Sequence, residues 1–140
     1  VELYTLEKLD NFFVSTDARC TQGSDASLCY GLWFRLSEKG SYIFEVCNNQ
    51  TFQVRLLTLP NISESLIDWT QSDAIQVGKT NNIAVAAVGD HYQFFINRQL
   101  VTSMVNNKLD RGLVGILISL YSNSELQAQY EFDNFLILAP

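Results

Sequence analysis

Three short segments of the sequence bring aromatic, cationic and carboxylate side chains to one face of a predicted sheet. Neighbouring side chains in a strand point to opposite sides, so Trp33 and Arg35 share one side of the first segment. The same alternation places Glu45, Gln53 and Arg55 on that side in the next two segments. A flat indole can stack on a sugar ring, and guanidinium and carboxylate groups can hydrogen-bond its hydroxyls. The face is therefore a candidate carbohydrate groove. The alternative is a solvated face on which Glu45 bridges two arginines, each exposed pair contributing only ~0–1 kcal/mol.

The connections between these segments fix which side chains face each other. A three-residue loop after Cys47 and a turn around Gly40 together predict four cross-strand pairs. These pairs are Ile43 with Arg55, Glu45 with Gln53, Arg35 with Ile43, and Trp33 with Glu45. Such pairing would gather the polar and aromatic side chains into one cluster.

A second group of candidate residues lies in the segment from Pro60 to Lys79, where the alternation breaks. The segment is predicted to be a long loop, and long loops inside compact domains are often functional. It carries Asp68 and Trp69, which would complete the binding surface. The full set of candidate ligand-binding residues is Trp33, Arg35, Glu45, Arg55, Asp68 and Trp69.

The elements that must position these residues are strands. Strand-length segments of period two alternate with clusters of Gly, Asn, Asp and Ser, which is typical of an all-β sandwich or barrel. The predicted strands are Phe12–Cys20, Leu28–Leu36, Tyr42–Cys47, Phe52–Thr58, Asn82–Val88, Tyr92–Ile96, Leu100–Val105, Val114–Tyr121 and Gln127–Leu138.

Length and charge narrow the class of protein. A chain of 140 residues without a compositional break is expected to form a single domain over residues 1–140. Its net charge is −6 and its nine Lys and Arg residues are scattered, which argues against a nucleic-acid partner. No run of ~18 apolar residues is present, so direct membrane insertion is not expected. The start at Val1 is compatible with a domain excised from a longer chain.

The three cysteines are Cys20, Cys29 and Cys47. Cys20 and Cys29 bracket a polar segment that is predicted to be a hairpin loop, so the two could face each other across it. A Cys20–Cys29 disulfide would indicate an oxidising compartment. The alternative is free thiols, and the state of Cys47 is left open.

An ordered set of short motifs resembles one family of folds. The pair Tyr30–Arg35 and Tyr42–Val46 is similar to the core strands of bacterial concanavalin-like jelly-roll domains. The similarity continues in order through Asp68–Thr70, Asn82–Val85, Phe95–Asn97, Gly112–Gly115 and Phe132–Phe135. Arg98 stands where many members carry Gly after the Asn of a turn, which suggests a different loop geometry.

The resemblance implies a two-sheet antiparallel jelly-roll sandwich of the concanavalin A-like lectin and glucanase (laminin-G-like) type. Members occur as extracellular modules of bacterial multidomain proteins, and their concave sheet is the usual glycan surface. We therefore expect a non-catalytic recognition module, extracellular or periplasmic, that binds a glycan or a protein and is accompanied by other domains of its parent chain. A structural or protein-interaction spacer domain is the alternative.

Catalysis and metal binding have weaker support in the sequence. Related glucanases carry Glu-x-Asp-x-Glu on one strand, and the nearest match, Glu131 with Asp133, lacks the second Glu. His91 lies alone after a turn and is given no role, so no catalytic residue and no cofactor is predicted. Structural calcium stays open, because scattered carboxylates can bind it without a short motif. The aspartates that could contribute are Asp17, Asp25, Asp68, Asp73 and Asp133, for which roles in turns are favoured.

Overall fold

The computed structural model describes residues 2–3, 8–22, 28–58, 60–120 and 129–140. Within these residues the chain forms eleven strands and no helix. The strands are β1 (Glu2–Leu3), β2 (Phe12–Gln22), β3 (Leu28–Ser37), β4 (Gly40–Cys47), β5 (Thr51–Thr58), β6 (Ile62–Gln71), β7 (Asn81–Val88), β8 (His91–Ile96), β9 (Gln99–Val105), β10 (Leu113–Leu120) and β11 (Gln129–Leu138).

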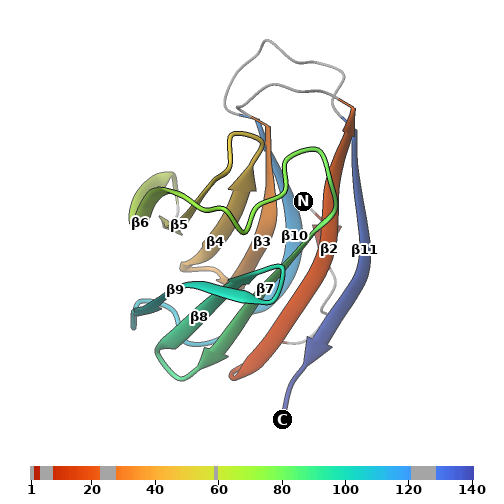
Figure 1. Ribbon diagram of the computed structural model, residues 1–140. Helices are drawn as coiled ribbons and strands as arrows, with labels where there is room; N and C mark the ends of the chain where they lie inside the picture. The colour runs from red at the N-terminus through yellow and green to blue at the C-terminus, as the bar shows by residue number, and fades with distance from the viewer. Residues whose placement is uncertain (1, 4–7, 23–27, 59, 121–128) are drawn as a thin grey trace.

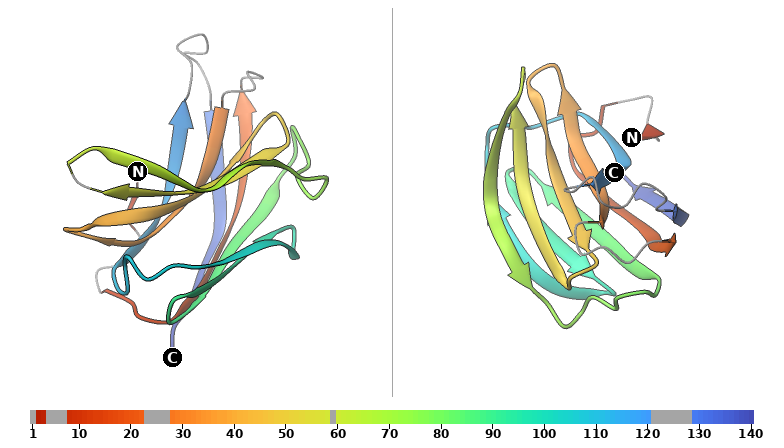
Figure 2. Two further views of the ribbon diagram at one scale, coloured as in Figure 1. Left: turned by 90° about the vertical axis from the view of Figure 1, so that its left-hand side faces the viewer. Right: turned by 90° about the horizontal axis from the view of Figure 1, so that it is seen from above.

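The strands form two antiparallel sheets that pack face to face (Figures 1 and 2). The six-stranded sheet has the order β1-β10-β3-β4-β5-β6, and the five-stranded sheet has the order β11-β2-β7-β8-β9. Strands far apart in the sequence are neighbours in both sheets, because β10 pairs with β3 and β11 pairs with β2. This is the jelly-roll sandwich that the sequence predicts.

The core forms where the inward side chains of the two sheets meet. Every second side chain of β3 points inward, which brings Tyr30, Leu32 and Phe34 into the core. Every second side chain of β4 and β5 does the same. Aromatic rings from both sheets then pack against one another, as Phe34 does with Tyr92 and Phe94 of β8. Ring pairs of this kind stabilise a core beyond their buried area by about 0.5–1.5 kcal/mol each.

Nine of the strands lie where the sequence predicts them, but the predicted long loop is wrong. Residues Ile62–Gln71 of that segment form β6, an edge strand that pairs with β5. Two register shifts interrupt this pairing, and the consecutive residues Leu66 and Ile67 both pack on the core. A bulge of this kind removes the period of two on which the prediction depended.

The predicted cross-strand register is correct on one side of β4 and wrong on the other. Glu45 pairs with Gln53 and Ile43 pairs with Arg55, as expected. In contrast, Trp33 pairs with Ile43, and Glu45 lies opposite Gly31. The turn between β3 and β4 contains only Glu38 and Lys39, so Ser37 pairs with Gly40 and the register moves by one residue. A register shift between Phe34 and Ser37 moves it by one more.

The predicted Cys20–Cys29 disulfide is also wrong. Cys20 belongs to β2 in the five-stranded sheet, whereas Cys29 belongs to β3 in the six-stranded sheet, so the two are not partners in one hairpin. The disulfide joins Cys29 to Cys47, which are direct cross-strand partners in β3 and β4. Most of the segment between Cys20 and Cys29, including Asp25, lies outside the described residues.

The turn at Asn97 and Arg98 keeps its left-handed geometry without glycine. It joins β8 to β9 in two residues, with φ of 51° at Asn97 and 66° at Arg98. Asn tolerates this region, and Asn97 is further held by hydrogen bonds from its amide to Ala74 O and Asn81 Oδ1. The Gly-to-Arg departure therefore leaves the hairpin intact.

Candidate functional site

The six-stranded outer face, which turns away from the core, holds three of the six predicted binding residues. We define it by Trp33 of β3, Ile43 and Glu45 of β4, and Gln53 and Arg55 of β5. These residues alternate with core residues along their strands, so they share the outward side. The structure brings Glu45, Gln53 and Arg55 into direct contact.

Glu45 is the centre of a polar cluster on this face. Its side chain is fully buried, although it points away from the hydrophobic core. Its Oε1 atom accepts a hydrogen bond from Arg55 Nε at 3.0 Å and another from Gln53 Nε2. Hydrogen bonds to a carboxylate are strong, so the two partners hold it in a fixed orientation.

Trp33 forms the floor of the face. Its side chain is only 4% exposed and packs with Ile43 and Leu117. The indole Nε1 donates a hydrogen bond of 3.1 Å to the carbonyl oxygen of Ile116 in β10. The ring is therefore fixed by its surroundings and presents little surface for stacking.

A hollow of about 270 Å³ opens beside the polar cluster. Its apolar wall includes Trp33, Ile43 and Leu57, and its polar residues are Arg55, Ser41 and Ser119. A concave apolar surface with a few polar groups is the usual composition of a small-ligand site.

The β6 edge adds the second predicted group of residues. Thr70 pairs with Phe52, which faces the core, so its neighbour Trp69 points outward, and the indole is 47% exposed. Ser65 pairs with Arg55 and donates a hydrogen bond of 2.6 Å from Oγ to Asp68 Oδ1. Asp68 and Trp69 thus stand at the border of the six-stranded outer face, on a strand instead of a loop.

Arg35 does not belong to this face, contrary to the prediction. A register shift follows Phe34, and Arg35 takes a left-handed φ of 52°, which turns its side chain inward. There it is 1% exposed, and its guanidinium donates to the carbonyl oxygens of Asp10, Gly89 and Leu109. It also lies over the Tyr92 ring, 5.1 Å from the centroid. Arg35 therefore ties three connections together at one end of the sandwich.

The carboxylates considered for hydrolysis, Glu131 and Asp133, both lie on the outward side of β11. Glu131 is on β11, on the outward side of the five-stranded sheet, where it pairs with Arg19 at 3.1 Å. Glu45 is on the outward side of the other sheet, so Glu45 and Glu131 cannot flank one bond.

The aspartates considered for calcium hold the backbone and amides in place. Asp17 accepts hydrogen bonds from Asn134 Nδ2 at 2.8 Å and Asn82 Nδ2 at 2.9 Å, and these two bonds lower the pKa of its carboxyl. Asp133 Oδ1 accepts from the backbone N–H of Asn134. Among the described residues no three His, Cys, Asp or Glu form a group that could hold a metal ion. Calcium binding stays an untested expectation.

Sequence reasoning missed several residues of the candidate site. Leu117 and Ser119 come from β10, which is more than 80 positions from Trp33 but pairs with its strand. Ser65 lies in the segment that was predicted to be a loop. No local pattern could reveal either contribution, because the first depends on strand order and the second on an irregular strand.

The sequence matches no protein-family profile and no curated protein sequence. The structure, however, is similar to that of the carbohydrate-binding module CBM66 from Bacillus subtilis, with a TM-score of 0.76 and 17% identity over 94% of this chain and 77% of that chain. It is also similar to CG-16, a homodimeric agglutinin from chicken liver, with a TM-score of 0.70 and 9% identity over 98% of both chains.

A third similar structure is a protein of Parabacteroides distasonis provisionally named a glycosyl hydrolase, with a TM-score of 0.67 and 11% identity over 97% of this chain and 81% of that chain. At these identities the similarity concerns the fold. The chain therefore has the lectin-like jelly-roll fold of the concanavalin type that its motifs predict. Among the described residues no helix is long and apolar enough to cross a membrane.

Proposed function

We propose that this chain is a non-catalytic carbohydrate-recognition module whose ligand binds the six-stranded outer face. The observation that carries the proposal is the position of Glu45. Its carboxylate is buried and hydrogen-bonded by Gln53 and Arg55 on the outside of a sheet. A face that is only solvated would leave such a carboxylate in water.

The polar cluster is suited to sugar hydroxyls because it is held in place before a ligand arrives. Removing a charge from water costs several kcal/mol unless hydrogen bonds compensate it. The donors around the Glu45 carboxylate must therefore stay in place, which keeps the cluster ordered without a ligand. Ligand binding then loses less side-chain entropy. Arg55, whose side chain is 20% exposed, carries this arrangement to the surface.

Trp69 supplies the apolar part of the proposed site. Its half-exposed indole stands on β6 next to Thr70, at the register shift between β5 and β6, and can stack on the face of a sugar ring. The hollow next to Trp33 and Arg55 would take a substituent of that sugar. The carbohydrate-binding module and the agglutinin among the structural neighbours support the same non-catalytic role.

An extracytoplasmic location, extracellular or periplasmic, belongs to the proposal. The Cys29–Cys47 disulfide supports it, because disulfides persist in oxidising compartments. Alkylation before and after reduction, on protein taken from its native host fraction, would test whether this pair is oxidised in the cell.

A glycan array followed by calorimetric titration of the strongest hits tests the binding function. We expect Trp69→Ala to weaken binding by about tenfold or more, as loss of a stacking ring of ~1–3 kcal/mol would do. Phe95→Ala is the matched control, since this ring lies on the outer side of the other sheet. Binding that Phe95→Ala weakens and Trp69→Ala spares would contradict the proposed surface.

A structural or protein-interaction spacer is the second candidate, and the burial of Trp33 favours it. A buried ring that donates its N–H to Ile116 is part of the scaffold and presents no flat platform. The array separates the two functions, because a spacer binds no glycan and tolerates Trp69→Ala without a change in any binding curve.

A further inference from the structure

The outer surface of the five-stranded sheet is apolar where a solvated sheet face is normally polar. We define this five-stranded outer face by three rows of outward residues. Two rows cross all five strands, and a third crosses β7, β8 and β9. The rows are Leu136-Ser15-Ala84-Phe95-Leu100, then Leu138-Phe13-Ala86-Gln93-Ser103, and finally Val88-His91-Val105.

Large aliphatic side chains on this face are strongly exposed. Val88 and Val105 are exposed by 65% and 64%, and Leu138 by 57%. Leu100 and Leu136 are exposed to about half of their surface. Single exposed apolar residues are ordinary, but a contiguous patch commonly marks an interaction surface.

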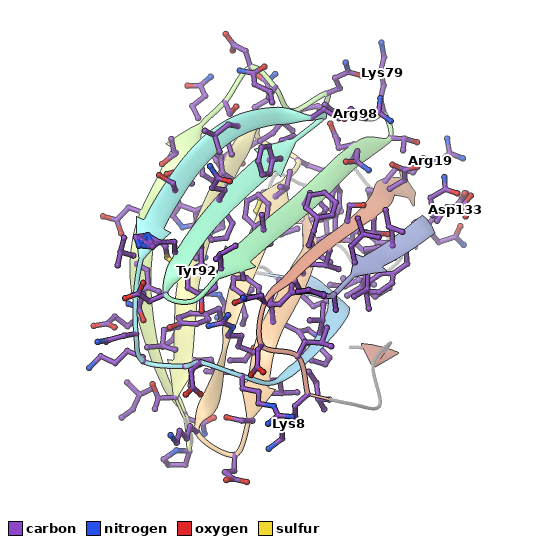
Figure 3. The ribbon with its side chains drawn as sticks, turned by 90° about the horizontal axis from the view of Figure 1, so that it is seen from below. Lys8, Arg19, Lys79, Tyr92, Arg98 and Asp133 are labelled. Atoms are coloured by element: carbon purple, nitrogen blue, oxygen red, sulfur yellow. A yellow bond between two sulfur atoms is a disulfide. The ribbon has the colours of Figure 1, made fainter. Side chains whose placement is uncertain are left out.

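Charged side chains stand only at the border of these three rows. The rows contain no Asp, Glu, Lys or Arg, and His91 at their end lies 3.5 Å from Asp90. At the opposite end, Asp17 and Asp133 form the next row, and Arg19 and Glu131 follow. Figure 3 views this sheet and shows Arg19, Asp133 and Arg98 gathered at that end.

We propose that the five-stranded outer face binds the same face of a second copy of this chain. Each copy carries a net charge of −6, so two copies repel unless their contact surface avoids like charges. The three rows meet this condition. A glycan would find few partners there, because Ser15, Gln93 and Ser103 are the polar residues of the two long rows.

The shape of the face suits a copy of itself. Two twisted sheets pack about 10 Å apart with their strands rotated by about 30°, and identical faces have identical twist. Small residues, Ser15, Ala84 and Ala86, occupy the centre on β2 and β7, and larger rings and aliphatic groups surround them. A hollow of about 620 Å³ lined by Phe13, Val88 and Leu138 opens at one end. Large side chains of one copy can therefore pack over the small central residues of the other copy, or enter its hollow.

The area of the face suits a weak dimer. Five strands spaced about 4.8 Å apart span roughly 19 Å, and the three rows extend roughly 14 Å between their outer members. These spans enclose roughly 270 Å² between strand and row centres, which is below the ~800 Å² that each partner of a standard interface buries, so the dimer should be weak and transient. A two-fold axis would place each residue of the patch in the contact twice.

Sedimentation velocity of the whole chain over a range of micromolar concentrations tests the proposal. We expect a monomer–dimer equilibrium for the unmodified protein. Val88→Asp and Leu136→Asp should each raise the dissociation constant by about a hundredfold, because the new carboxylate enters the contact twice. Ile62→Asp is the matched control, since Ile62 is equally exposed at 64% but lies on β6 of the other sheet, and this variant should dimerise normally.

Two results would overturn the proposal. One is a chain that stays monomeric over the whole range, in which case the face serves a different partner. The other is dissociation by Ile62→Asp as strong as that by Val88→Asp. If an Asp variant does not fold, Val88→Ser with Leu100→Ser gives a milder version of the test. The carbohydrate proposal is tested separately, because Val88→Asp should bind glycan as the unmodified chain does.

Discussion

On the outer face of the six-stranded sheet a carboxylate is buried, whereas on the outer face of the five-stranded sheet aliphatic side chains are exposed. Both faces depart from the polar exterior that alternation predicts, and they do so in opposite ways. On the first face, burying the carboxylate costs free energy that its hydrogen bonds must offset. On the second, apolar side chains stay exposed to water. The contrast supports the proposal of two distinct binding surfaces on one small sandwich.

The largest effect that separates the faces is expected from their carboxylates. Glu45→Ala leaves Gln53 and Arg55 without their buried acceptor and should lower the free energy of unfolding by about 3 kcal/mol. Glu131→Ala breaks an exposed pair with Arg19 and should cost at most about 1 kcal/mol. Urea denaturation of both variants measures the difference. Equal decreases in the free energy of unfolding would mean that the Glu45 cluster is as solvated as the Arg19–Glu131 pair.

The disulfide belongs to the six-stranded sheet and should stabilise it by a similar amount. Cys29 and Cys47 are 18 positions apart, and closing a loop of this size contributes about 3 kcal/mol in the chain-entropy account. Replacing both by Ser should lower the urea midpoint accordingly. Cys20→Ser, which keeps the disulfide, is the control. If Cys20→Ser lowers the urea midpoint and the double replacement does not, the stabilising cysteine lies in the five-stranded sheet and the account is contradicted.

A smaller, pH-dependent effect is expected at the border of the five-stranded outer face. Asn134→Gly removes the amide that contributes most to the lowered pKa of Asp17, and Gly suits the φ of 53° at this position. We expect the pKa of Asp17 to rise towards its ordinary value in an NMR titration.

The sign of the accompanying stability change follows from linkage. A carboxyl whose folded pKa is lowered stabilises the fold above its unfolded pKa, and the contribution is lost as pH falls through the folded value. Asn134→Gly should therefore cost up to about 1 kcal/mol at neutral pH. Its pH-dependent part should vanish in strong acid, and a pH-independent difference would show that the Asp17 contact is not responsible.

The smallest effect on stability is expected from the exposed aliphatic residues. Val88→Thr removes apolar surface that is already in water, so the free energy of unfolding of the dilute monomer should change by no more than about 0.5 kcal/mol. The same change in Val85, which is buried in the core, should cost well over 1 kcal/mol. Thermal denaturation at low concentration compares the two, and a large loss for Val88→Thr would mean that this face is already covered.

The fold could be predicted from the sequence because nine strands keep the period of two over most of their length, and β4, β5, β8 and β9 follow turns of two or three residues. The prediction failed at β6 and at the end of β3, and the two places share a local irregularity. The bulge of β6 brings two adjacent residues, Leu66 and Ile67, to the core, and the left-handed Arg35 reverses the direction of its side chain. Alternation cannot anticipate either event, because each depends on tertiary contacts.

The candidate site could be predicted in part. Glu45, Gln53 and Arg55 lie on regular strands joined by a three-residue connection, so their common face followed from alternation and loop length. Trp33 lies on the expected side, but its burial depends on Leu117 and Ile116 of β10, a strand that reaches β3 only through the jelly-roll order. The cysteine pairing failed for the same reason, because it depends on which sheet each strand joins.

Mapping of backbone amide shifts during a glycan titration tests the central claim most directly. With the strongest hit of the array as the probe, we predict the largest shifts at Gln53, Arg55 and Trp69 on β5 and β6, and none on β2, β7 or β11. Shifts confined to the five-stranded outer face, around Phe13, Ala86 and Leu136, would contradict the assignment of the binding surface.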